Sequence, residues 1–225
     1  MTNYFTYINN ESYSLLFVKG GTHLEKENTL QQLRANEKEV RKQLILEATL
    51  ALFGEKQISE VSMRDIAKEA GISASLIYRH FKDRDELFIE AFILKSQEMI
   101  ATFECVILDK DIILIEDIGK EFVNYLIHNP LFFKMMSYFM LDHTLVADHL
   151  ERFNTTIREL LEIFDTGFKQ NGVKEDIRLH SHAFFSALNG IMITFYHYPG
   201  RSESEVEQHI EKLTTLISSL FTKSE

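Results

Sequence analysis

Several kinds of residue are scarce in this chain of 225 residues, and each shortage excludes a class of protein. A single cysteine, Cys105, excludes a disulfide framework or a thiolate zinc site and favours a reducing compartment. We expect this cysteine to fill space in the core rather than to react. Two prolines and nine glycines are too few for an all-β protein, which needs frequent turns. No run of 18 apolar residues is present, so we expect no membrane-spanning helix.

The charge is acidic overall but unevenly distributed. The net charge of −10 would, as an average, argue against a nucleic-acid partner. Residues 38–84, however, hold nine Lys or Arg against seven Asp or Glu, whereas residues 85–225 hold twelve against twenty-three. A mildly basic segment followed by an acidic segment indicates two modules with different partners. Together with 45% apolar residues, this composition predicts a folded chain with a real core.

Residues 1–35 are interpreted as an N-terminal extension, because no apolar periodicity or helix cap organises the first 23 of them. The segment is not a signal peptide, since it lacks a basic start and its apolar run is only four residues long. Lys19-Gly20-Gly21 can be encoded by a ribosome-binding sequence, and Leu24 follows closely. One hypothesis is therefore that translation starts at Leu24, and the alternative is that residues 1–23 are part of the protein.

A helical period dominates the rest of the chain, and we predict an all-α protein without internal repeats. A first helix is expected over residues 36–54. Ser62 and Asp65 form a capping box for a short helix that Gly71 ends, and Ser73 is expected to cap a second short helix. Asp83 and Glu86 are expected to form another capping box. The remaining helices are predicted at approximately 112–128, 130–141, 144–171, 176–197 and 203–222.

The two short helices and their glycine turn form a helix-turn-helix, the arrangement that places a second helix in the major groove of DNA. The surrounding pattern is longer: Ile45-Leu46-x-Ala48-x-x-x-Leu52-Phe53, Ser62-Met63-Arg64-Asp65-Ile66-Ala67-x-x-Ala70-Gly71-Ile72-Ser73 and Leu76-Ile77-Tyr78-x-His80-Phe81-Lys82-Asp83-Arg84-x-Glu86-Leu87. These roughly 50 contiguous residues closely resemble the TetR family of repressors. Gln57 departs from the pattern, because the family usually has glycine after the first helix, and this puts the shape of the turn in question.

The resemblance implies a DNA-binding domain over residues 36–84. It implies a base or phosphate contact for Arg64 and backbone contacts for Tyr78 and His80, whereas Phe81 is expected to be a buried anchor. Arg79 has the donors to pair with a guanine, and Leu76 fits either a DNA contact or the core. The candidate DNA-binding residues are Arg41, Lys42, Ser62, Met63, Arg64, Ser73, Ala74, Ser75, Leu76, Tyr78, Arg79, His80, Lys82 and Arg84.

The acidic segment of residues 85–225 is predicted to bind a ligand and to dimerise. It holds fourteen of the eighteen Phe and five of the seven Met, which line adaptable apolar cavities as well as cores. The helix over 130–141 is apolar all round, so we expect it to be buried on every side. The candidate ligand-binding residues are Phe103, Tyr138, Phe139, Phe164, Phe168, Phe185, Met192 and Tyr196.

A stripe of small residues on the helix over 176–197, together with the apolar face of the last helix, predicts a four-helix dimer interface. The alternative is that both stripes serve a core within one chain. The candidate interface residues are Ala183, Ser186, Ala187, Gly190, Thr194, Leu213, Ile217 and Leu220. The nine histidines fit no metal-ligand spacing, and no catalytic motif is present, so we expect no metal, no cofactor and no enzymatic activity.

The sequence therefore predicts a cytoplasmic, homodimeric, ligand-responsive transcriptional regulator of the TetR type, with no membrane partner. It would be a repressor that binds a palindromic operator in double-stranded DNA and is released by a small apolar or amphipathic effector. Fatty acyl compounds and hydrophobic xenobiotics are the effector classes to screen first. The alternative is a DNA-binding regulator whose C-terminal domain, residues 85–225, is controlled by a protein partner. The effector, the operator and the choice between repressor and activator cannot be derived from the sequence.

Overall fold

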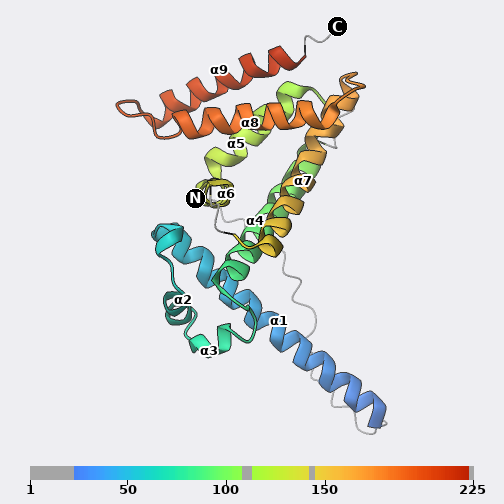
Figure 1. Ribbon diagram of the computed structural model, residues 1–225, viewed down its shortest axis with the longest axis vertical. Coiled ribbons are helices and arrows are strands. Elements are labelled where there is room, and N and C mark those ends of the chain that lie inside the picture. Colours follow the sequence, from blue (N-terminus) through green and yellow to red (C-terminus); the bar gives the residue numbers. More distant parts are fainter. Residues whose placement is uncertain (1–22, 108–112, 142–144, 223–225) are drawn as a thin grey trace. The chain divides into compact units, whose positions relative to one another are not determined.

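The computed structural model describes residues 23–107, 113–141 and 145–222 (Figure 1). Within these ranges the chain forms nine α-helices and one 3-10 helix, with no strand, so the predicted all-α class is confirmed. The described residues fall into two units, which are divided between Gln43 and Leu44. The proposed alternative start and most of the predicted N-terminal extension concern residues outside the described ranges.

Helix α1 (His23–Glu55) begins well before residue 36, where the sequence pattern placed its start. The apolar period exists only from Ile45 onward, where one face of α1 is buried. In the turns before Ile45, residues 30–44 include no buried residue, and exposed Leu30, Leu33 and Val40 lie among polar residues. Those turns consist mostly of strong helix formers such as Leu, Gln, Glu, Lys and Arg. A search for apolar periodicity therefore misses a helix that helix propensity favours.

The 3-10 helix η1 (Ile58–Glu60) and the short helices α2 (Met63–Glu69) and α3 (Ala74–Ile77) follow α1. We call residues 57–83, which contain these elements, the head. Gln57 has φ −63° and ψ 137°, an ordinary extended conformation. The turn after α1 therefore does not need the glycine whose absence the sequence pattern had flagged.

The body, residues 84–222, contains the six remaining helices. Ranges were predicted for the last five of these helices. They agree with the structure to within a few residues at each end, and the prediction for residues 130–141 agrees with both ends of α6. The helices are α4 (Arg84–Ile107), α5 (Ile115–His128), α6 (Pro130–Leu141), α7 (Ala147–Gln170), α8 (Ile177–Phe195) and α9 (Glu203–Phe221).

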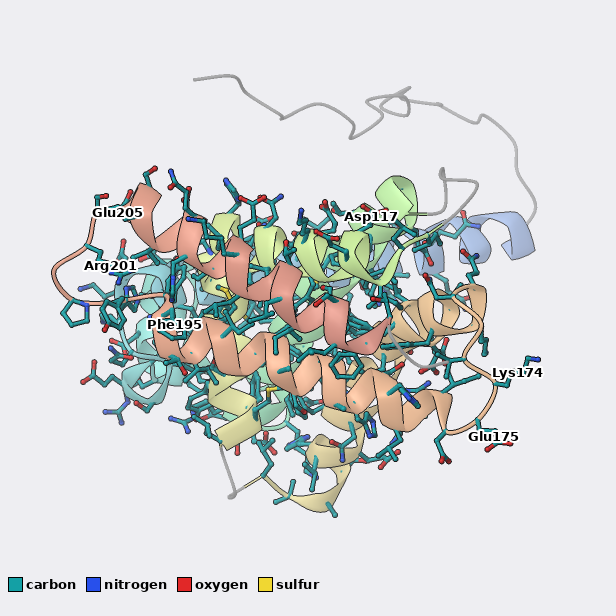
Figure 2. All side chains as sticks on the ribbon, turned by 90° about the horizontal axis from the view of Figure 1, so that it is seen from above. Asp117, Lys174, Glu175, Phe195, Arg201 and Glu205 are labelled. Carbon is teal, nitrogen blue, oxygen red and sulfur yellow. The ribbon has the colours of Figure 1, made fainter. Side chains whose placement is uncertain are left out.

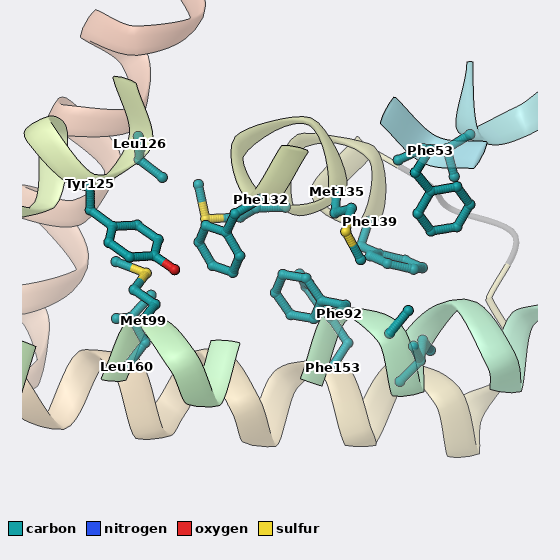
Figure 3. Packing of buried hydrophobic residues seen from close by; sticks show 14 of the residues in the cluster. Phe53, Phe92, Met99, Tyr125, Leu126, Phe132, Met135, Phe139, Phe153 and Leu160 are labelled. Atoms are coloured by element: carbon teal, nitrogen blue, oxygen red, sulfur yellow. The ribbon is translucent and has the colours of Figure 1, made fainter. Parts of the chain in front are cut away.

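Aromatic rings fill the core of the body (Figure 3). Phe92 of α4 lies at the centre of one cluster, where it stacks on Phe132 of α6 with ring centroids 5.6 Å apart. Phe139 of α6 and Phe153 of α7 contact the same ring. Such ring pairs add to the burial energy of each side chain, so this cluster joins α4, α6 and α7 firmly.

Two expectations about single features were wrong. Helix α6 is not buried on every side, because Phe133 and Tyr138 are half-buried and Leu141 is 69% exposed. Cys105 is exposed on α4 and fills no space in the core. In the described residues, no helix is both long enough and apolar enough to cross a membrane.

Candidate DNA-binding site

A complete capping box begins α2. The Ser62 Oγ accepts from the Asp65 amide at 3.2 Å, and the Asp65 carboxylate accepts from the Ser62 amide at 3.0 Å. Hydrogen bonds from Ser62 and the nearby charge of Lys56 hold the pKa of the Asp65 carboxyl below its ordinary value. The predicted capping box is confirmed, and it fixes the first turn of a helix that is only seven residues long.

The turn between α2 and α3 closes as a Schellman motif around Gly71. The Ile72 amide donates to the Ala67 carbonyl at 2.9 Å, and the Gly71 amide donates to the Lys68 carbonyl at 3.2 Å. Gly71 has φ +65°, as the sequence predicted for this corner. Ser73 precedes α3, but its hydroxyl lies 2.9 Å from that of Ser75 and makes no cap bond to the helix. The turn geometry therefore sets the direction of α3.

Most of the predicted DNA-binding side chains on the head lie at its surface. Tyr78 is 55% exposed although it is a large aromatic residue. Ala74, Leu76 and His80 are half-buried at the edge of this surface. Phe81, in contrast, is 1% exposed and anchors the turn after α3 in the core, as expected. The exposed members of the predicted set on the head are Ser62, Arg64, Ser73, Ser75, Tyr78, Arg79 and Lys82.

Two predicted contacts are placed differently from the rest. The side chain of Met63 is buried, with 7% of its surface exposed, so in this structure it belongs to the core of the head. Arg84 is half-buried, donates to the Ser59 carbonyl at 3.3 Å and lies over the Phe88 ring at 5.2 Å. Arg84 therefore joins the head to α4. Its half-buried guanidinium is less accessible to a phosphate than the ammonium group of the exposed Lys82.

Arg41 and Lys42 lie in the first compact unit, on α1. Arg41 is exposed and forms an ion pair with Glu37 one turn earlier, while Lys42 is half-buried. Their predicted role as contacts to the DNA backbone stays a prediction.

The sequence model of the tetR family of bacterial regulatory proteins matches residues 45–91, which include the C-terminal part of α1, the whole head and the first turns of α4. This match covers 47 of the 225 residues, and over this segment the chain is similar to the TetR family.

Two curated relatives each match a segment of similar length. An uncharacterised helix-turn-helix transcriptional regulator of Haemophilus influenzae is 42% identical over 59 residues, which are 26% of this chain and 29% of that protein. The regulator AcrR of Shigella flexneri is 40% identical over 58 residues, which are 26% of this chain and 27% of AcrR. The matched segment therefore spans less than a third of the length of these relatives.

Solved structures extend the likeness in fold to the body. The transcriptional regulator FadR of Bacillus subtilis, in complex with stearoyl-CoA, has a TM-score of 0.64 and 18% identity and covers 80% of this chain and 97% of its own. A TetR-family regulator of Marinobacter aquaeolei has a TM-score of 0.57 and 18% identity, with coverages of 82% and 97%. The fold, a helix-turn-helix followed by a helical domain, is thus shared with these structures. Both curated relatives are named as transcriptional regulators.

The predicted ligand-binding residues of the body are distributed over several hollows and the core. Phe103 lines a groove of about 470 Å³ between α4 and α7, Tyr138 a cleft beside η1, and Tyr196 a hollow near the start of α9. The other five are core residues, each at most 6% exposed, or fully buried: Phe139, Phe164, Phe168, Phe185 and Met192. In the described conformation the aromatic side chains pack against one another instead of lining a common cavity.

The predicted dimer residues lie on α8 and α9, which run side by side (Figure 2). The small residues Ala183, Ser186, Gly190 and Thr194 are exposed, while Ala187 is half-buried. A Cβ added to Gly190 would meet nothing within 4 Å, so this face of α8 is open. On α9, Leu220 is 61% exposed, and Leu213 and Ile217 are half-buried. Exposed Ile193 and Leu216 extend the apolar surface on the two helices.

Two residues that the sequence did not single out connect the body to the region of the DNA-binding site. Lys134 of α6 donates to main-chain carbonyls at the end of α1, and His149 of α7 contacts Asp83. Lys134 is the only charged residue in α6, and a single charge in an otherwise apolar helix could have indicated its contact role from the sequence. In the described residues no cluster of three or more His, Cys, Asp or Glu side chains could hold a metal ion.

Proposed function

We propose that the chain is a homodimeric, ligand-responsive transcriptional regulator that represses by binding a palindromic operator. The observation that carries this proposal is the exposed row of polar and basic side chains on a TetR-family helix-turn-helix. Arg64, Tyr78 and Arg79 project from a head whose short helices are fixed by a capping box and a Schellman turn. Rigid presentation of such groups is what direct contact with phosphates and base edges requires.

The dimer is supported by the open face of α8 and α9. Small side chains there allow close approach of another helix, and the exposed leucine and isoleucine residues would be covered by a second copy. Two heads in one dimer would reach half-sites one helical turn of DNA apart, about 34–36 Å. The acidic body would repel loose DNA binding elsewhere on the molecule.

The experiment is a fluorescence-anisotropy titration of the purified protein with DNA from its own upstream region, at a stated salt concentration. Arg64→Ala and Tyr78→Ala should each weaken operator binding about tenfold, because each removes one DNA contact worth roughly 1–3 kcal/mol. Arg201→Ala is the matched control, since Arg201 is an exposed arginine in the loop between α8 and α9 (Figure 2). Wild-type affinity for both head variants would refute the proposed contacts.

The proposed effector is a small apolar or amphipathic molecule that binds the body. Stearoyl-CoA is the first probe, because the similar FadR structure holds it. The groove between α4 and α7 has an apolar floor that includes Ile100 and Phe103. Glu104, Glu159 and Glu162 also line it, and none of its lining residues in the described part of the chain is a lysine or arginine. These carboxylates oppose the phosphates of coenzyme A, so we expect a neutral probe such as Nile red to bind this groove better than stearoyl-CoA does.

A thermal-shift titration compares the two probes, and binding of either should raise the Tm. The same probe should then lower operator affinity, since an effector acts only through its different affinity for two states of the protein. A second candidate is control of the body by a protein partner, because open grooves beside a filled core also suit a protein ligand. Absence of any shift across fatty acyl compounds and hydrophobic xenobiotics would favour that candidate.

A further inference from the structure

The C-terminal end of α1 is closed by a side chain from another helix. The last carbonyls of an α-helix have no partner within the helix, and a glycine with positive φ commonly closes them through main-chain amides. Neither Lys56 nor Gln57, the two residues after α1, has a positive φ. Instead the Lys134 ammonium donates to the Phe53 carbonyl at 2.8 Å and to the Lys56 carbonyl at 2.6 Å. Its positive charge also complements the negative end of the helix dipole.

The N-terminal end of α4 is contacted in a similar way. The Asp83 carboxylate accepts from the Glu86 amide at 2.8 Å and thereby caps α4. The Nε2 of His149 lies 3.1 Å from the same carboxylate oxygen, and His149 is 4% exposed. Partial burial raises the pKa of the Asp83 carboxyl, but the hydrogen bonds from Glu86 and His149 together outweigh it and hold that pKa below its ordinary value. The buried imidazole therefore meets a charged partner.

These two contacts lie at the two chain boundaries of the head. Lys134 binds main-chain atoms just before residue 57, and His149 binds the last residue of the head, Asp83. Both come from consecutive helices of the body, which the Phe92 cluster holds together (Figure 3). An ion pair between Arg152, three residues after His149, and Glu90 also connects α7 to α4. Helices α6 and α7, which contact the boundaries of the head, are therefore packed firmly within the body.

We propose that Lys134 and His149 are positioning residues that together set the position of the head on the body. Holding both boundaries fixes where the chain of the head enters and leaves, so a shift of α6 or α7 moves the whole DNA-binding surface. Lys134 acts on α1 directly, and His149 acts through the cap of α4. Neither residue needs to touch DNA. The consequence for operator affinity rests on the proposed function, whereas the positioning itself does not.

Hydrogen–deuterium exchange of the DNA-free protein tests the positioning by itself. Lys134→Met keeps the length of the side chain but removes its donors, so amides at the end of α1 and in residues 57–83 should exchange about tenfold faster. Lys134→Arg should restore slow exchange, because the guanidinium also donates to carbonyls. Lys95→Met is the matched control, since Lys95 is a partly exposed lysine that pairs with Glu98 within α4.

His149 is tested in the same way with a conservative pair. His149→Leu should speed exchange in the first turn of α4 and the adjoining head, whereas His149→Gln, whose amide can donate to Asp83, should preserve protection. Faster exchange confined to the head, with rescue by Arg and Gln, would support the proposal. Unchanged exchange in Lys134→Met, or acceleration spread equally over α8 and α9, would overturn it.

Operator titration then separates the positioning from the proposed function. Lys134→Met should bind operator about tenfold more weakly and Lys134→Arg almost normally, which corresponds to the loss and recovery of one charge-assisted contact. Faster exchange in the head with full operator affinity would support the positioning role but overturn its proposed consequence for operator binding. If the wild-type protein binds no operator at all, the proposed function fails, and the exchange data still decide whether the two residues hold the head.

Discussion

The head and the body are stabilised by different kinds of contact. The head contains one fully buried aromatic residue, Phe81, and its short helices depend on the Ser62–Asp65 capping box and the Gly71 turn. The body has long helices whose buried phenylalanines contact one another in a continuous series of ring pairs. Directional main-chain contacts fix the shape of the head, while burial of apolar area supplies most of the stability of the body.

This difference means that equal losses of stability have different consequences. A change in the body core lowers the stability of the whole unit, because many rings share contacts. A change at a cap or a turn of the head costs less but alters the surface that is proposed to meet DNA. The following predictions use matched pairs of substitutions to separate the two effects.

The largest effect is expected for Phe132→Ala in the body. Phe132 is 1% exposed and contacts Phe92 and Tyr125, so its removal should cost about 3–5 kcal/mol of the free energy of unfolding. The neighbouring Phe133 is half-buried, and Phe133→Ala should cost clearly less. Urea denaturation of both variants measures the difference. Equal midpoints would contradict the view that ring packing dominates the body.

A smaller effect is expected for Gly71→Ala in the head. No atom lies within 4 Å of the added Cβ, so the cost is the strain of φ +65°, about 1–2 kcal/mol. Gly54→Ala, near the end of α1, is the control, because its Cβ also meets nothing and its φ is not positive. That change should be neutral or stabilising by up to about 1 kcal/mol. The sharper test is operator affinity, which should fall for Gly71→Ala alone.

Two equivalent capping boxes allow the head and the body to be compared directly. Ser62→Ala and Ser202→Ala each remove the same hydroxyl from a complete box, and each should cost about 1 kcal/mol. Helix α2 has seven residues and α9 has nineteen, so exchange of amides should rise through all of α2 but only in the first turn of α9. Equal fraying in both helices would show that the head is as well supported as the body.

The smallest effect on stability is expected when the pH is lowered. Hydrogen bonds within the two boxes hold the pKa values of Asp65 and Glu205 below their ordinary values of 3.8 and 4.5. A lowered pKa in the folded state adds stability above the ordinary pKa, and this stability is lost as the pH falls through the lowered one. The Tm should therefore start to fall below about pH 4.5. Asp65→Asn should reduce this dependence on pH, and an unchanged pH profile in that variant would contradict the assignment.

Local signals made the head predictable from the sequence. The Ser62–Asp65 spacing and the positive φ of Gly71 depend on neighbouring residues, and the structure confirms both. The start of α1 was missed because residues 23–35 form a helix without an apolar face. Glu86 was expected to complete a box with Asp83, but its carboxylate accepts from the Lys82 amide instead. Such a shift of one residue depends on side-chain geometry that spacing alone does not determine.

Contacts between distant parts of the chain were less predictable. Aromatic density indicated a cavity, but rings that fill a core and rings that line a pocket have the same composition, and the sequence cannot separate them. Exposed Cys105 shows the same limit, because its position in α4 depends on which face of the helix the other helices cover. The contacts made by Lys134 and His149 could not be derived from local pattern, since 66 to 81 residues separate the partners.

The contact between Lys134 and α1 also has a consequence for protein synthesis. A ribosome adds the 78 residues between Lys56 and Lys134 in roughly 4–16 s, at typical rates of about 5–20 residues per second. During that interval the DNA-binding segment has already been made, but the end of α1 still lacks the side chain that closes it. The growing chain would therefore have a loosely held head until α6 has emerged from the ribosome.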